Sequence, residues 1–148
     1  MPTSTLPPSA LTDADIARIG RGLVDRTLPK SEWTHAAHFA AAFWLITRDG
    51  ADPEAQMPGL IRAYNAATGG VNSDTEGYHE TITLASLRAA RAVLAARPHA
   101  SLAAALADLL AGPLGRSDWL LAHWSKDRLF SVEARRAWVE PDLQPLPF

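Results

Sequence analysis

The segment WTHAAHFAAAFWLIT, residues 33–47, contains no Asp, Glu, Lys or Arg. A helix without charged residues is stable in a soluble protein only when other elements cover it nearly all round. Ser31 and Glu32 just before the segment suit a helix start, and Asp49-Gly50 after it suit a helix end. We therefore predict a central helix over residues 32–48, with the rest of the chain packed around it.

Further helices are predicted on both sides of this segment from caps, stops and apolar spacing. Thr12 suits an N-cap, and apolar residues at helical intervals follow it, which predicts a helix over about 13–26. Asp52 and Gly69-Gly70 mark the ends of a third helix over 53–67. The same signals predict a fourth helix and three shorter ones, over 76–96, 101–112, 117–124 and 131–139.

No part of the chain favours a β-sheet. No segment alternates between apolar and polar residues for long enough to require a strand, and no segment repeats. Short connections between six or seven helices are typical of an antiparallel helical bundle. We therefore expect an all-α fold, with one domain over residues 11–148 and a flexible leader, rich in Pro, Ser and Thr, over residues 1–10.

Composition narrows the function classes. The chain has 148 residues, of which 47% are hydrophobic, and its Lys and Arg total 14 against 16 Asp and Glu. Without a basic excess, no nucleic acid partner is expected. The lack of cysteine excludes disulfides, thiolate metal sites and a cysteine nucleophile. With no signal-peptide pattern and no apolar run of about 20 residues, we expect a cytoplasmic protein without a membrane partner. Nothing in the sequence predicts an oligomeric state.

Three of the five histidines are predicted to lie close together. In a helix, His35 and His38 share one face, with about 5–6 Å between their Cβ atoms. If the second, third and fourth helices run up, down and up, the second and fourth begin at the same end of the bundle. His79 then lies at the level of the other two histidines. The third helix ends there too, which adds Tyr64 and Asn65.

The first functional hypothesis is a metal site. His35, His38 and His79 would hold one divalent ion such as Zn, Fe, Mn or Ni, because imidazole nitrogen suits these metals. Glu80 would be a fourth ligand, a group that orients a ligand, or a general base. This hypothesis predicts a small metal-dependent enzyme, a hydrolase or lyase acting on a small polar metabolite, with His79 and Glu80 as candidate catalytic residues.

Two alternatives need no metal. In one, a histidine beside Glu80 binds or deprotonates a small-molecule ligand, since imidazole titrates near physiological pH. Asn65, Tyr78 and Thr81 would supply hydrogen bonds, and Tyr64 and Thr83 lie at the same predicted end. In the other, the protein is a sensing or interaction domain in which these residues form a buried hydrogen-bond network.

Two features outside the central motifs are weaker candidates. His123, between Trp119 and Trp124, would complete the site from a later helix. The segment 128–142 pairs opposite charges with an apolar stripe, which indicates a lid or brace over the bundle. Within it, Arg135 and Arg136 are candidates for contact with an anionic ligand or for surface ion pairs.

The chain also resembles a family of small bacterial proteins whose activity is uncharacterised. The resemblance covers most of residues 28–145. It lies in Leu28-Pro29, Trp33-Thr34-His35, His38, Tyr64-Asn65, Gly77-Tyr78-His79-Glu80-Thr81-Ile82-Thr83, Arg128-Leu129-Phe130-Ser131, Ala134-Arg135 and Pro141-Asp142. The resemblance implies that these segments belong together, and it implies no reaction and no cofactor.

Overall fold

The uncharged segment forms α2, His35–Ile46, in a computed structural model that describes residues 11–148. The Thr34 hydroxyl caps the helix by accepting a hydrogen bond from the backbone N–H of Ala37. The helix starts later than predicted, because Lys30–Glu32 form a separate 3-10 turn and Thr34 is extended. Buried residues on α2 lie on several sides of the helix, as its composition predicts: Ala37, Phe39, Ala40, Ala41, Ala42, Phe43 and Leu45.

Helix α1, Asp13–Asp25, packs against α2. Thr12 and Asp15 form a capping box at its start, as the sequence predicts for the N-cap. The two helices approach closely at Gly20, where an added Cβ would lie 2.3 Å from the indole of Trp44. A side chain larger than hydrogen has no room at that position.

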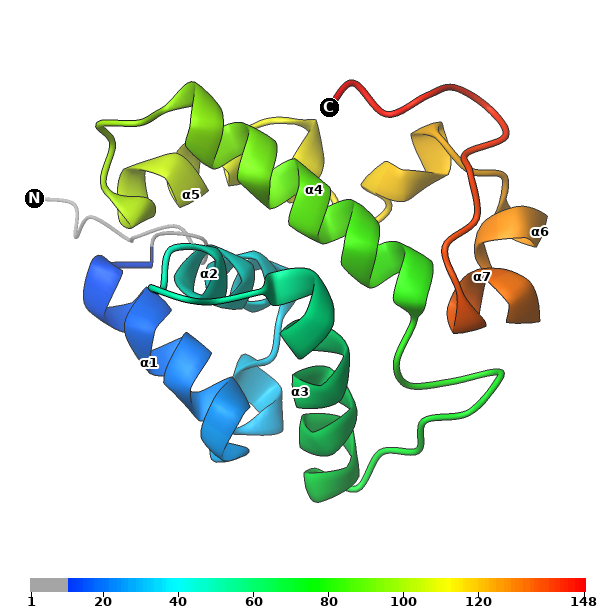
Figure 1. The fold of residues 1–148 in the computed structure, drawn as a ribbon, viewed down its shortest axis with the longest axis horizontal. Coiled ribbons are helices and arrows are strands. Elements are labelled where there is room, and N and C mark those ends of the chain that lie inside the picture. The colour runs from blue at the N-terminus through cyan, green and yellow to red at the C-terminus, as the bar shows by residue number, and fades with distance from the viewer. Residues whose placement is uncertain (1–10) are drawn as a thin grey trace, which may run out of the picture.

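Helices α3, Pro53–Ala67, and α4, Glu80–Ala96, complete the body of the fold (Figure 1). Asp52 caps α3, as predicted. The predicted start of the fourth helix at residue 76 is wrong. The chain remains outside the helix up to His79, whose ring caps α4 by accepting a hydrogen bond from the N–H of Ile82.

The remaining elements are short. Helix α5, Leu102–Ala111, lies near the C-terminal end of α4, and α6, Lys126–Leu129, and α7, Val132–Arg136, lie near its start (Figure 1). The predicted helix over 117–124 is a 3-10 turn, Trp119–Ala122, and a second 3-10 turn spans Pro113–Gly115. The predicted helix over 131–139 ends at Arg136.

The all-α prediction is confirmed: residues 11–148 form one domain with seven α-helices and no strand. One hydrophobic core joins α1 to α5 and continues to Trp124, Leu129 and Trp138. Among these residues no helix has the length and apolar character needed to cross a lipid bilayer. The predicted leader, residues 1–10, lies outside the described residues.

Candidate functional site

A groove of about 370 Å³ opens where the starts of α2 and α4 meet the end of α3. It brings together five of the eight residues predicted for the site, namely His38, Asn65, Tyr78, His79 and Thr83. The rest of its wall consists of Lys30, Trp33, Ile61, Gly70, Val71, Glu76, Gly77 and Ile82. His35, Tyr64 and Glu80 do not line it.

His38 is the titratable group best placed to meet a ligand in the groove. Its ring stacks on Trp33, with 3.8 Å between the ring centroids and 30° between the planes. Nδ1–H donates to the Thr34 carbonyl oxygen at 2.6 Å, so Nε2 carries a lone pair in the neutral ring. Within residues 11–148, Nε2 makes no hydrogen bond. His38 is an exposed residue, but the protein packed around its ring desolvates the imidazole, which lowers the pKa of His38 and favours the neutral ring near pH 7.

His79 has a different role, because both of its nitrogens are bonded to backbone. Nδ1 accepts from the N–H of Ile82 at 3.1 Å, and Nε2–H donates to the carbonyl of Leu129 at 2.6 Å. The side chain is buried, and burial lowers its pKa. His79 therefore ties the start of α4 to the end of α6.

His35 is turned toward another part of the molecule. Its Nε2–H donates to the carbonyl of Leu114 at 2.8 Å, and its ring meets Phe39 edge-on. A metal shared by His35, His38 and His79 would have to displace a hydrogen bond of His79, because both nitrogens of its ring are bonded to backbone. In the part of the chain that the structure describes, no three His, Asp or Glu side chains are grouped to hold a metal ion. The metal site stays a prediction.

Glu80 pairs with Tyr78 instead of a histidine. The Tyr78 hydroxyl donates to a carboxylate oxygen of Glu80 at 2.5 Å. Burial and the neighbouring carboxylate raise the pKa of Tyr78 far above its usual value, so the phenol remains protonated. Arg62 lies over the Tyr78 ring, 4.6 Å from its centroid. This arrangement fixes Tyr78 as part of the wall of the groove.

The other predicted binding residues mostly hold the wall in place. Tyr64 is buried, and its hydroxyl donates to the carbonyl of Leu28 at 2.8 Å. The Asn65 amide donates to Asn72 at 3.0 Å, and the Thr83 hydroxyl donates to the carbonyl of His79. Thr81, named in the metal-free hypothesis, is also buried and contacts α7.

The groove is continued by a small apolar hollow of about 50 Å³. The two share Trp33, His38, Ile61, Ile82 and Thr83, and the hollow adds Ala42, Met57, Ser86 and Leu87. The stacked rings thus line both the groove, whose wall mixes polar and apolar residues, and the apolar hollow. Sequence patterns did not single out Trp33, Ile61 or Ile82 for this wall, because apolar residues at helical spacing equally predict an ordinary core.

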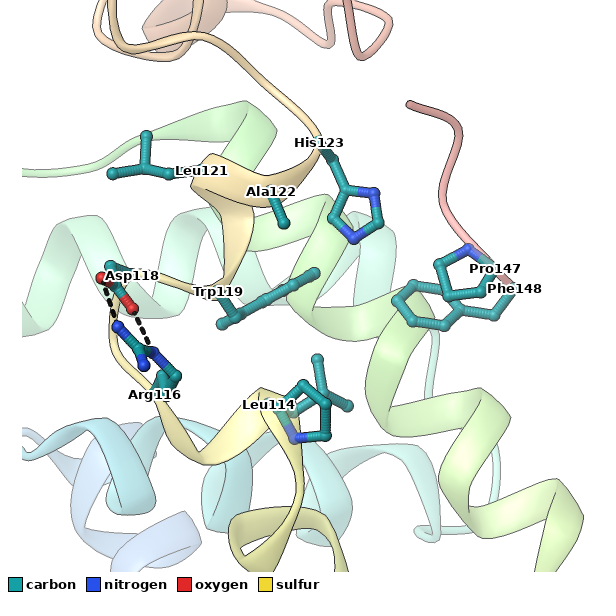
Figure 2. Close-up of a pocket in the computed structure, with 10 residues that line it drawn as sticks. Leu114, Arg116, Asp118, Trp119, Leu121, Ala122, His123, Pro147 and Phe148 are labelled. Atoms are coloured by element: carbon teal, nitrogen blue, oxygen red, sulfur yellow. Dashed lines mark hydrogen bonds and ion pairs between the residues drawn. The ribbon is translucent and has the colours of Figure 1, made fainter. Parts of the chain in front are cut away.

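A larger pocket, of about 560 Å³, lies elsewhere and includes His123 (Figure 2). Figure 2 shows His123 and Trp119 on one side and Pro147 and Phe148 opposite them. Nδ1–H of His123 donates to the carbonyl of Pro145 at 3.1 Å. This pocket shares no residue with the groove, so the structure does not bring His123 to the predicted site. Its walls are mostly apolar, which gives fewer groups for chemistry.

Comparison with known proteins identifies no relative. No protein-family model, curated protein or solved structure matches the chain. The resemblance to uncharacterised bacterial proteins stays a prediction. The function therefore has to be argued from the groove around Trp33 and His38.

Proposed function

We propose that the groove binds a small molecule without a metal ion and that His38 is the residue that recognises it. The observation that carries the proposal is the position of the His38 ring. Trp33 and the Thr34 carbonyl fix the ring and its tautomer, and the unbonded Nε2 belongs to a side chain that lines the groove. A preorganised acceptor of this kind needs no rearrangement to bind a ligand.

The lining favours a small, partly apolar ligand. A groove of about 370 Å³ lies at the lower end of the size range of small-molecule pockets. Lys30 and Glu76 contribute one positive and one negative charge to the lining, so a neutral or zwitterionic ligand suits it better than a multiply charged one. The adjoining hollow would take an apolar group.

Nε2 of His38 would accept a hydrogen bond from a hydroxyl, amide or amine of this ligand. Because the neutral ring dominates near pH 7, the same nitrogen is suited to accept a proton as a general base. Binding is the proposed function, and proton transfer at His38 is the chemistry that a bound hydroxyl or amine would permit.

The proposal is tested by screening small planar metabolites that carry hydroxyl or amide N–H groups, such as nucleobases and hydroxylated aromatic acids. Ligand-observed NMR and thermal shift should give saturable binders. His38→Phe retains a ring against Trp33 but removes Nε2, and it should weaken those binders about tenfold or more. His99→Phe, at an exposed turn, is the matched control and should leave affinity unchanged.

Two results would contradict the proposal. One is a set of binders whose affinity does not change in His38→Phe. The other is about one equivalent of Zn, Fe, Mn or Ni retained by protein purified without an affinity tag, together with loss of that metal in His38→Phe. The second result would support the metal-dependent hydrolase or lyase predicted from the sequence.

A further inference from the structure

A second pocket, of about 160 Å³, lies between the loop before α4 and the helix α7. It shares only Tyr78 with the groove, and three arginines contribute to its wall. Its lining is Arg62, Asn72, Ser73, Asp74, Tyr78, Arg135 and Arg136. Arginine side chains gathered around a cavity point to an anionic ligand, because guanidinium binds oxyanions through paired hydrogen bonds.

Arg135 is held in place by backbone and has no carboxylate partner within residues 11–148. One terminal nitrogen, Nη1, donates to the carbonyls of Gly77 at 3.0 Å and Tyr78 at 3.3 Å. Nε is buried without a partner in the described part of the chain. The other terminal nitrogen, Nη2, makes no hydrogen bond to residues 11–148 and is not among the buried groups, so it remains accessible. A fixed guanidinium with an open Nη2 is suited to bind an oxygen atom.

The remaining charges leave the pocket positive. Arg136 pairs with both carboxylate oxygens of Asp74, at 2.8 and 2.6 Å. Arg62 lies over the Tyr78 ring and forms no ion pair within residues 11–148. The lining thus contains three guanidinium groups and one carboxylate, in a chain whose formal net charge is −2, and Glu80 adds a second carboxylate at the Tyr78 hydroxyl. The excess of positive charge is local to this pocket.

We propose that this pocket binds the oxyanion group of a small molecule, a phosphate or a carboxylate, between Arg62 and Arg135. Its volume of about 160 Å³ is several times the roughly 30 Å³ that a water molecule takes up in the liquid, which is room enough for either group. Nη2 of Arg135 and the guanidinium of Arg62 supply the donors, and Ser73 adds a hydroxyl to the wall. This inference does not depend on the function proposed for the groove.

The test is an NMR titration of the full chain with inorganic phosphate, sulfate and acetate, each at constant ionic strength adjusted with sodium chloride. Saturable shifts are expected for the amides of residues 73–78 and for the side-chain N–H of Arg135. Arg62→Gln should weaken binding about tenfold. Arg21→Gln makes the same charge change at an exposed position of α1 and should leave binding unchanged.

A variant that is expected to tighten anion binding provides a second test. Asp74→Asn removes the carboxylate and releases Arg136, so it should tighten binding. If Arg62→Gln does not fold, the affinity of Asp74→Asn alone tests the proposal: tighter binding supports it, and unchanged or weaker binding contradicts it. Preference for phosphate or for acetate would identify the source of the oxyanion. Shifts that grow linearly without saturation, or equal weakening by Arg62→Gln and Arg21→Gln, would overturn the proposal.

Discussion

His79 shows how a single residue can lie in a predicted site and still serve the fold. Its Nδ1 must be unprotonated to accept the N–H of Ile82, and its Nε2–H is bonded to Leu129. Protonation of the ring would break the cap of α4, because Nδ1 would then carry a proton. Burial adds to this cost, and the pKa of His79 in the folded chain is accordingly lowered below its usual 6.5.

The first prediction concerns acid stability. Because the folded chain binds this proton less readily than the unfolded chain, the contribution of His79 to the free energy of unfolding is present above pH 6.5 and is lost as the pH falls further. His79→Asn keeps a capping oxygen but does not titrate. Urea denaturation should therefore show that the free energy of unfolding falls less between pH 8 and pH 5 in His79→Asn than in the wild type. Identical pH profiles would exclude His79 as the cause, because His38 is present in both proteins.

The location of the groove could be predicted from sequence, but the role of each residue in it could not. Helix direction alone brings His38, Asn65 and His79 to one end of the fold. What each imidazole does depends on carbonyl groups far away in the chain, those of Leu114 for His35 and Leu129 for His79. The residue pattern within one segment does not show which distant carbonyl group a side chain will bond.

Packing between helices is determined by side-chain volume, and α1 against α2 is the clearest case. Gly20 lies in the middle of α1, where glycine is normally unfavourable, yet an added Cβ would overlap the Trp44 indole. Gly59 lies in the interior of α3, and, apart from its chain neighbours and the nearby backbone of α3 itself, no heavy atom lies within 4 Å of the position that an added Cβ would take. The two glycines thus allow a direct comparison.

The second prediction is that one substitution has opposite effects at these two positions. Gly20→Ala should lower the free energy of unfolding by about 1–3 kcal/mol through overpacking, despite the better helix propensity of alanine. Gly59→Ala should raise it by about 0.5–1 kcal/mol, because it relieves the entropy cost of glycine without a clash. Chemical denaturation of both variants measures the difference. Stabilisation by both would mean that α1 and α2 can separate at no cost.

The first and last residues of a helix could be predicted from the sequence where the capping residue and the helix-ending residues were of the usual types. Asp52 and Ala67 bound α3 as predicted, whereas α4 begins four residues later than residue 76. The error arose because the cap is an imidazole nitrogen, a role for which Ser, Thr, Asp and Asn are the usual residues.

At the scale of the whole molecule, Thr81 connects the C-terminal segment to the bundle. Its hydroxyl is fully buried, and its single proton is shared between the carbonyls of Ala134 at 2.7 Å and Ala137 at 3.0 Å. It also accepts from the N–H of Val139 at 3.2 Å. The brace predicted for residues 128–142 therefore depends on a hydroxyl of α4.

The third prediction is that Thr81→Val loosens this segment. The variant keeps the volume but leaves buried backbone groups without partners, so the free energy of unfolding should fall by about 2–3 kcal/mol. Amide exchange should rise most over residues 124–139. Thr47→Val, near the end of α2, removes hydrogen bonds within one helix only and should change stability by less than about 0.5 kcal/mol. Equal exchange increases throughout the chain would contradict a local role for Thr81.

The course of the C-terminal region could not be predicted, since it follows individual side-chain bonds and not a repeating pattern. The indole N–H of Trp124 donates to Val139, the Ser125 hydroxyl to Asp142, and Nε of Arg128 to the carbonyl of Glu140. Each bond joins residues 12 to 17 positions apart. The charge pairs and the apolar stripe of residues 128–142 indicate only that this segment packs against the rest of the protein.

The uncharged composition of α2 also affects the chain before it has folded. Residues 35–46 contain no Asp, Glu, Lys or Arg to keep two unfolded copies apart, and Phe39, Phe43 and Leu45 are buried only once the other helices have assembled. Until then the segment is free to associate with its counterpart in another chain. The helix that holds His38 in place is therefore also a segment that favours association between unfolded chains during synthesis.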